Sequence, residues 1–306
     1  MICVRDVRKS FDGTVALDGF GMTVKGGSVY GLVGTNGAGK TTILRMLAGV
    51  LKPDAGDITI AEMPVFENEA VKERLTFIPD DLSFINKYTP KDLARLYASL
   101  YDRWDGALMN RIMWEFGLDM KVPLSRFSKG MQKQAVFALA LATTPEYLLL
   151  DEPIDGLDPF AKRMVWYYIT EASKIRGMTT LVSSHNLREM EGVCESVGII
   201  DHGHMVLEKE LDELRGDIHK VQISFGRGEG GSASATPEGA YAGLNVVHIE
   251  QRGAVDIIIA RESREALEGW NAEFSPLLFD PIPLTLEEVF IYELGDANHA
   301  NSSIFE

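Results

Sequence analysis

Hydrophobic residues along the chain follow two patterns, and these patterns alternate. Short runs that are apolar throughout, such as residues 147–150, are typical of strands buried on both faces of a mostly parallel sheet. Longer runs with an apolar residue at every third or fourth position, such as Leu93, Leu96 and Leu100, predict amphipathic helices. The predicted strands span 3–11, 14–24, 29–33, 57–60, 74–78, 147–150, 179–183, 196–200, 220–225, 246–249 and 255–259, and the predicted helices span 42–47, 90–100, 104–116, 128–142, 159–175, 186–193, 264–270 and 286–294. The alternation predicts an α/β fold.

Two features interrupt this alternation in the first part of the chain. Asp12-Gly13, between the first two strands, is a two-residue turn typical of an antiparallel hairpin. No convincing strand falls within 80–144, although helical patterns do. We therefore predict an α/β core with an antiparallel β subdomain and an inserted helical subdomain over about 80–144.

The last part of the chain has a different character. Residues 226–240 (GRGEGGSASATPEGA) have the composition of a flexible linker. Strand and helix patterns resume beyond it, and residues 217–306 carry a large excess of acidic over basic residues. We expect a first domain over 1–216 and a small α+β accessory domain over 217–306, which would regulate the first domain or stabilise a dimer.

Charge and hydropathy narrow the class of protein. The formal net charge of −15 argues against a nucleic-acid binder, which needs a basic surface to displace counterions from phosphates. The longest apolar run, 135–142, is far shorter than the roughly 20 residues that span a bilayer. The N-terminus lacks the apolar core of a signal peptide, and the two cysteines, Cys3 and Cys194, have no metal-ligand spacing. These observations predict a cytoplasmic chain with free thiols.

Residues 34–41 (GTNGAGKT) fit G-x-x-x-x-G-K-[ST] and lie between a predicted strand and a predicted helix. This is the context of a phosphate-binding loop, in which glycines let backbone N–H groups converge on phosphates at a helix N-terminus. Lys40 is expected to reach the β- and γ-phosphates, and the hydroxyl of Thr41 to bind Mg²⁺. The residues expected to contact the nucleotide here are Asn36, Gly37, Ala38, Gly39, Lys40, Thr41 and Thr42.

Two adjacent acids follow the most apolar strand. Asp151 ends the run 148–150 and is expected to lie near Mg²⁺, whereas Glu152 can hold and deprotonate the attacking water. The segment 156–159 (GLDP) follows closely. Together with the phosphate-binding loop, these motifs predict a P-loop ATPase that uses ATP and Mg²⁺.

With these motifs in this order, the chain resembles the nucleotide-binding subunits of ABC transporters over residues 2–215. Ser128-Lys129-Gly130-Met131 occupies the place of the signature Leu-Ser-Gly-Gly-Gln, with Phe127 for its leading leucine. The resemblance implies that this segment acts in trans on ATP bound by an opposing subunit. The residues that it implies at the site are Ser128 and Gly130 on the γ-phosphate, Asp158 across the dimer interface, His185 as the switch histidine and Phe11 on the adenine.

One position departs from the family pattern. The glutamine that touches Mg²⁺ and water should follow Pro79, yet Asp80 stands there with Asp81 beside it. A carboxylate can bind Mg²⁺, so Asp80 is a candidate metal ligand, but it would add negative charge near the phosphates.

The resemblance implies a subunit that hydrolyses ATP and drives a separate transmembrane permease at the inner face of the cell membrane. The runs 101–105 (YDRWD) and 284–290 (LTLEEVF) favour a bacterial export-type system. Two copies could build two complete ATP sites, so we expect a homodimer or a heterodimer with a related subunit. The alternative is a soluble ABC ATPase that acts on ribosomes or chromosomes, which the acidic charge does not favour.

Overall fold

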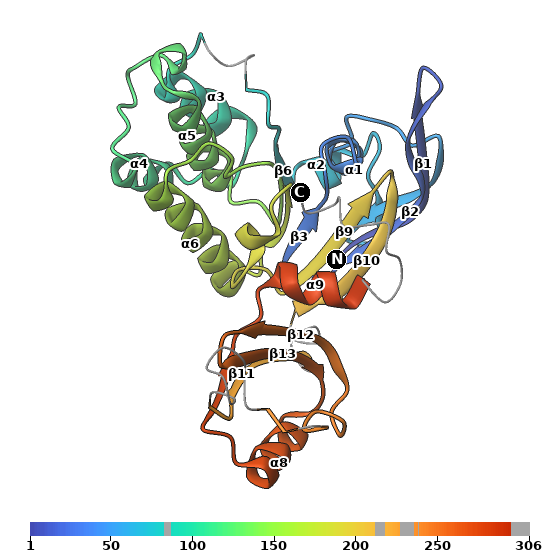
Figure 1. Cartoon of the computed structure of the whole chain (residues 1–306). Helices are drawn as coiled ribbons and strands as arrows, with labels where there is room; N and C mark the ends of the chain where they lie inside the picture. Colours follow the sequence, from blue (N-terminus) through green and yellow to red (C-terminus); the bar gives the residue numbers. More distant parts are fainter. Residues whose placement is uncertain (83–86, 212–217, 227–235, 238, 295–306) are drawn as a thin grey trace. The chain divides into compact units, whose positions relative to one another are not determined.

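The structure is a computed structural model that describes residues 1–82, 87–211, 218–226, 236–237 and 239–294. The chain divides into two compact units, Met1–Glu208 and Lys209–Glu306 (Figure 1). Of the linker predicted for 226–240, residues 227–235 and 238 lie outside the described residues. Each unit is described by itself.

The first unit begins with an antiparallel sheet in the strand order β2-β1-β4-β5. Its strands are β1 (Ile2–Phe11), β2 (Thr14–Val24), β4 (Ala55–Ile60) and β5 (Met63–Pro64). The predicted hairpin turn between β1 and β2 is present, with positive φ angles of 47° at Asp12 and 84° at Gly13. This sheet is the predicted antiparallel β subdomain.

The second sheet of this unit contains six strands in the order β10-β9-β3-β8-β7-β6. They are β3 (Val29–Val33), β6 (Leu75–Ile78), β7 (Tyr147–Asp151), β8 (Thr179–Ser184), β9 (Ser196–Asp201) and β10 (His204–Glu210). The ladders that join β6, β7, β8, β3 and β9 are all parallel. Every residue of β3, β7 and β8 is buried, as expected for central strands of a parallel sheet. The apolar sequences of β3 and β7 predict this burial, whereas β8 also buries four Ser and Thr side chains.

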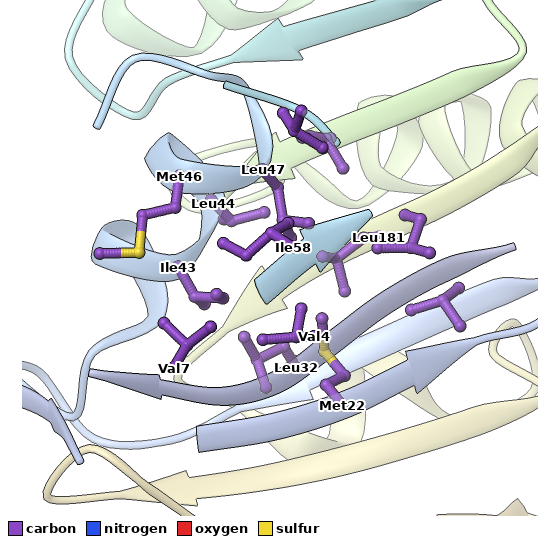
Figure 2. Close-up of a cluster of buried hydrophobic side chains, with 14 of the residues drawn as sticks. Val4, Val7, Met22, Leu32, Ile43, Leu44, Met46, Leu47, Ile58 and Leu181 are labelled. Carbon is purple, nitrogen blue, oxygen red and sulfur yellow. The ribbon is translucent and has the colours of Figure 1, made fainter. Parts of the chain in front are cut away.

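Helix α1 (Lys40–Leu47) is fixed by a buried apolar cluster that includes residues of both sheets. Figure 2 shows Ile43, Leu44 and Leu47 of this helix among side chains of the strands. The labelled strand residues of the cluster are Val4, Val7, Met22, Leu32, Ile58 and Leu181. Each such side chain contributes about 1.5–3 kcal/mol when fully buried, so the helix that follows the phosphate-binding loop has a rigid support.

Between β6 and β7 the described chain forms helices and no strand, as predicted for the inserted subdomain. Figure 1 shows α3, α4 and α5 gathered together, away from the hairpin of β1 and β2. These elements are α3 (Pro90–Leu100), α4 (Gly106–Glu115), the 3₁₀ turn η2 (Leu124–Arg126) and α5 (Lys129–Ala142). Thr89 and Asp92 form a capping box at α3, which explains why this helix begins directly after Thr89.

Elsewhere in this unit, the structure contains one helix that the sequence did not predict and lacks one helix that it did predict. The short α2 (Glu69–Lys72) was not predicted, whereas α6 (Pro159–Arg176) agrees with prediction. The helix predicted for 186–193 is wrong: only a 3₁₀ turn, η3 (Leu187–Met190), forms there. Glu191 leaves the helical region with ψ of 127°, and Gly192 has φ of 75°, so the turn cannot propagate.

The second unit contains a four-stranded sheet in the order β12-β13-β11-β14. Its elements are β11 (Ile218–Ser224), β12 (Val246–Arg252), β13 (Val255–Arg261), α8 (Arg264–Phe274), β14 (Leu278–Ile282) and α9 (Leu286–Leu294). Trp270 of α8 anchors the core, since its ring stacks on Phe274 and its Nε1–H donates to the Ala240 carbonyl at 2.7 Å. The sequence did not predict β14, which pairs with β11.

Candidate active site

The candidate site lies where adjacent parallel strands end at one edge of the six-stranded sheet. Val33 of β3 pairs with Ser184 of β8, Asp151 of β7 pairs with Ser183, and Ile78 of β6 pairs with Leu150. Ligands bind outside the carboxyl ends of such strands. The phosphate-binding loop, His185, the two acids and Asp80 each follow one of these strands, so the topology gathers them at one edge.

The phosphate-binding loop needs glycine where its backbone touches neighbouring strands. A Cβ at Gly34 would lie 2.3 Å from the carbonyl oxygen of Ile200. Gly39 has φ of 114°, and a Cβ there would lie 2.8 Å from the carbonyl oxygen of Ala16. Gly39 is also the N-cap of α1 and supplies no side-chain cap. The N–H groups of the first turn of α1 are therefore not capped by a side chain, which suits an anion such as a phosphate.

The other predicted residues of this loop differ in exposure. Asn36 and Gly37 are exposed, whereas Ala38 is buried and its N–H donates to the Thr35 carbonyl at 3.2 Å. Thr42 is partly buried in the first turn of α1. The tip of the loop is therefore accessible to a nucleotide from solvent, whereas the base of the loop is held in place by its buried contacts.

Lys40 lies inside the loop, with 5% of the residue exposed. Its Nζ donates to the carbonyl oxygens of Gly34 at 2.6 Å and Thr35 at 3.1 Å. The same Nζ lies 3.3 Å from Oε1 of Glu152. The loop carbonyls and one carboxylate thus hold the ammonium group where phosphate oxygens would compete for it.

Asp151 is 1% exposed and has one unpartnered oxygen. Its Oδ1 accepts a hydrogen bond from Ser183 Oγ at 2.7 Å, but the buried Oδ2 has no hydrogen-bond partner. Burial raises the pKa of the Asp151 carboxyl, and hydrogen bonds from Ser183 and Thr41 oppose that effect. A hard cation such as Mg²⁺ fits this donor set, because it would supply the missing partner of Oδ2 beside the Thr41 hydroxyl.

Asp151 would not bind Mg²⁺ with protein ligands alone. Among the described residues, no group of three or more His, Cys, Asp or Glu side chains is arranged to bind a metal ion. Mg²⁺ commonly takes one or two carboxylates together with substrate phosphates and water. The residues therefore fit Mg²⁺ that arrives with a nucleotide.

Glu152 is held by contacts on both its backbone and its carboxylate. Its φ is 46°, in the left-handed region that a non-glycine residue seldom occupies. Its N–H donates to Ser183 Oγ at 3.1 Å, and its carbonyl oxygen accepts from Lys133 Nζ at 2.7 Å. The carboxylate lies 3.3 Å from Lys40 Nζ and 2.9 Å from His185 Nδ1. The side chain is thus placed between the phosphate-binding loop and the segment after β8.

The segment after β8 is held by its own polar network. Ser184 Oγ donates to Glu189 Oε2 at 2.8 Å and accepts from the N–H of Asn186 at 3.0 Å. Lys162 of α6 pairs with Glu189 Oε1 at 2.8 Å. The His185 side chain is 48% exposed, so its imidazole can contact Glu152 and solvent together. The network fixes the chain on the C-terminal side of the histidine.

Asp80 is close to a lysine that the sequence did not single out. Its Oδ1 lies 2.9 Å from Lys133 Nζ, and its side chain is 56% exposed. A role for Asp80 as a Mg²⁺ ligand stays a prediction. Sequence reasoning also missed Ser183, although the pair Ser183-Ser184 directly before the candidate His185 is a signal that could have indicated it.

Four predicted residues are positioned by elements outside the sheet edge. Ser128 caps α5 by accepting from the Met131 N–H at 3.2 Å, and Asp158 caps α6 by accepting from the Phe160 N–H at 2.9 Å. Gly130 approaches the segment 156–159, since a Cβ there would lie 3.0 Å from the carbonyl oxygen of Gly156. Phe11 is 43% exposed at the end of β1, with Lys9 Nζ 5.5 Å from its ring centroid. These contacts of the four residues do not reach residues 34–41.

Comparison with known proteins identifies what the chain is similar to. A family model described as "ABC transporter" matches residues 17–155. The chain is 28% identical over 295 residues to the ABC transporter ATP-binding protein YtrB of Bacillus subtilis (strain 168), which covers 96% of this chain and 98% of that protein. It is 34% identical over 218 residues to a Nod factor export ATP-binding protein I of Bradyrhizobium diazoefficiens, which covers 68% of this chain and 70% of that protein.

A solved structure of the ATP-binding subunit of an ABC transporter has a TM-score of 0.64 to this chain at 27% identity. The match covers 70% of this chain and 92% of that one. This likeness confirms the α/β P-loop NTPase fold predicted from the sequence.

Proposed function

The chain belongs to the ATP-binding subunits of ABC transporters, which hydrolyse ATP to power transport, and on that premise we propose that Glu152 is its general base. The observation that carries this proposal is the position of the Glu152 carboxylate, 3.3 Å from Lys40 and 2.9 Å from His185. Such a carboxylate can take the proton of a water that attacks the γ-phosphorus. His185 would then orient the carboxylate and the γ-phosphate.

The remaining residues of the sheet edge would bind ATP. The uncapped N-terminus of α1 would receive the phosphates, and Lys40 would exchange its carbonyl partners for β- and γ-phosphate oxygens. Because Lys40 also pairs with Glu152, this exchange would free the carboxylate to hold water. Thr41 and Asp151 would hold Mg²⁺, which neutralises charge on the phosphates when bound. Phe11, exposed at the end of β1, would stack on the adenine.

We propose that two ATPase subunits bind two ATP molecules head to tail. Ser128 is exposed and Gly130 is partly exposed at the start of α5, and Asp158 is exposed at the start of α6. These three residues would reach the ATP held by the opposite subunit, where the N-terminus of α5 faces its γ-phosphate. The chain contains both halves of such a site, so a homodimer is sufficient, and a related subunit could replace one copy.

The dimer is tested with the Glu152→Gln variant, which keeps the size of the side chain but cannot accept a proton. It should bind ATP, fail to hydrolyse it and elute as a dimer with Mg-ATP, measured by gel filtration with multi-angle light scattering. With Mg-ADP it should elute as a monomer, and adding Lys40→Ala should abolish the dimer. A variant that binds ATP without hydrolysis and stays monomeric would refute the homodimer and favour a different partner subunit.

We further propose that the subunit drives a separate membrane-spanning partner. A test of this proposal requires both proteins. No helix among the described residues is long and apolar enough to cross a membrane. The family and the name of the Nod factor export relative support a transporter, and an exporter in particular. The subunit would then lie at the inner face of the membrane through its partner.

The partner is tested by co-expressing the chain with the membrane protein of the neighbouring gene. The two should co-purify, and the membrane protein should raise ATP turnover in vesicles. A membrane protein that leaves the chain in the unbound fraction would contradict this pairing.

A further inference from the structure

Lys133 of α5 contacts two segments of the candidate site at the same time. Its Nζ lies 2.9 Å from Oδ1 of Asp80, which follows β6, and donates at 2.7 Å to the carbonyl oxygen of Glu152, which follows β7. The Lys133 side chain is 12% exposed. With Asp151 and Phe137 it lines a cavity of about 10 Å³, no larger than one water molecule. The lysine is thus enclosed between two strand ends.

We propose that Lys133 is a positioning residue for Glu152, and that Asp80 is the counterion that holds Lys133 in place. This inference rests on the proposed role of Glu152 as general base. It assigns a task to Asp80 other than binding Mg²⁺: the pair Asp80–Lys133 connects the segment after β6 to the general base.

The backbone of Glu152 shows why its position needs support. Its φ of 46° is unfavourable for a side chain with a Cβ, so neighbouring contacts must maintain it. Ser183 accepts the N–H of Glu152 at 3.1 Å, and Lys133 donates to its carbonyl oxygen at 2.7 Å. These two contacts fix the peptide groups on both sides of the residue. Loss of the Lys133 contact would leave one of them free, and the carboxylate would no longer point reproducibly at the attacking water.

The charges explain why a carboxylate can occupy position 80. Asp80 places a negative charge on the segment after β6, and β6 pairs with β7, the strand that ends at Asp151. A lysine at 2.9 Å compensates this charge, so the pair as a whole is neutral, as a single glutamine would be. Because Asp80 is more than half exposed, the ion pair itself should add little to stability. Its effect should therefore appear in turnover.

The test compares Lys133→Met, Lys133→Arg, Asp80→Asn and the double variant that combines Lys133→Met with Asp80→Asn. Lys133→Met should lower kcat by roughly tenfold, as expected for a displaced base, while affinity for a fluorescent ATP analogue stays within about twofold. Lys133→Arg keeps the charge and the donors and should recover most of the turnover. Lys174→Met removes a lysine exposed on α6 and is the matched control, with no change expected in either quantity.

The double variant distinguishes a coupled pair from two unrelated residues. Without Lys133, the Asp80 carboxylate is an uncompensated negative charge near the phosphates. Asp80→Asn should therefore recover part of the turnover that Lys133→Met loses. If the double variant loses turnover by the product of the two single losses, the two residues act independently and the inference is wrong. A loss of ATP affinity in Lys133→Met that parallels its loss of turnover would also overturn the inference, because it indicates a general structural defect.

The outcome can be separated from that of the proposed function. If Glu152→Gln is inactive and Lys133→Met has the turnover of the wild type, only the positioning inference is wrong. If Glu152→Gln hydrolyses ATP normally, the assignment of the base is wrong and the positioning inference fails with it. Melting temperatures identify any variant that does not fold. If Lys133→Met does not fold, Asp80→Asn alone still decides, because it removes the counterion of Lys133 at nearly constant side-chain size. Lower turnover at unchanged ATP affinity in Asp80→Asn supports the inference, and wild-type turnover contradicts it.

Discussion

Replacing Asp151 by asparagine should make the protein more stable without a nucleotide and less stable with one. The carboxylate is 1% exposed, and its buried Oδ2 has no hydrogen-bond partner. Asparagine has the same size and keeps an acceptor for Ser183 Oγ, which now lies 2.7 Å from Oδ1. The substitution therefore removes a buried charge and preserves the packing.

The expected gain in stability follows from the cost of that oxygen. A buried polar atom without a hydrogen bond costs about 1–3 kcal/mol, and a charged one costs more. The amide would still leave one polar atom unpartnered, so we expect a net gain of about 1 kcal/mol. For a unit of this size, such a gain raises the melting temperature by about 2–4 °C.

The assay is thermal unfolding with and without Mg²⁺ and a non-hydrolysable ATP analogue. A ligand at 100 times its dissociation constant stabilises the wild type by about 2.7 kcal/mol. The variant lacks the carboxylate proposed to hold Mg²⁺ and should gain much less, so the order of the two melting temperatures should reverse.

Asp105→Asn is the matched control. The Asp105 side chain caps the N-terminus of α4 by accepting from the N–H of Leu108, and asparagine caps helices equally well. It should change neither melting temperature nor ligand response. An Asp151→Asn protein that melts below the wild type without a nucleotide, or keeps the full ligand response, would refute the reasoning about Oδ2.

Three further predictions follow from other contacts. Lys40→Ala should abolish ATP binding in an equilibrium titration while the chain stays folded; affinity equal to that of the wild type would refute the site. Glu146→Gln should cost about 0.5–1 kcal/mol in urea unfolding at neutral pH, since hydrogen bonds from Arg74 and Arg103 lower the pKa of the partly exposed Glu146 carboxyl. That contribution is present above the unfolded pKa of about 4.3 and is lost as pH falls through the lowered pKa, so a cost independent of pH would contradict it. A chain that ends at Glu210 should still bind ATP; one that folds but does not bind would show that the second unit is required.

Local signals explain most of what the sequence predicted. Residues 34–41 are contiguous, a Cβ at Gly34 or Gly39 would meet backbone atoms of other segments, and the spacing of the motif alone indicates a phosphate site. Asp151 and Glu152 adjoin a strand buried along its whole length, which the apolar run predicts. In each case the information lies within a few neighbouring residues.

Contacts between distant segments could not be predicted in the same way. The ion pairs Lys40–Glu152 and Asp80–Lys133 depend on which strands are neighbours, and the order β3-β8-β7-β6 differs from the order along the chain. A lysine in the first turns of an amphipathic helix also has no local pattern that distinguishes it from a solvated charge. Lys133 was therefore missed although its neighbours in the signature were identified.

One predicted helix did not form, and one strand was not predicted. The apolar spacing within 186–193 favoured a helix, but Gly192 takes a left-handed conformation and ends the turn early. The strand β14 was not predicted, and it contains Pro281, which cannot donate to a ladder. The structure tolerates it because β14 pairs with β11 at the edge of the four-stranded sheet.

Glu152 is proposed to take the proton of the attacking water while other residues bind ATP. Turnover and affinity of Glu152→Gln, measured together, test it most directly. We expect kcat to fall by roughly 10²-fold or more, because the general base is lost. The affinity for Mg-ATP should stay within a few-fold, because Lys40, Thr41 and the N–H groups of the loop are unchanged. Turnover close to that of the wild type at unchanged affinity would contradict the claim.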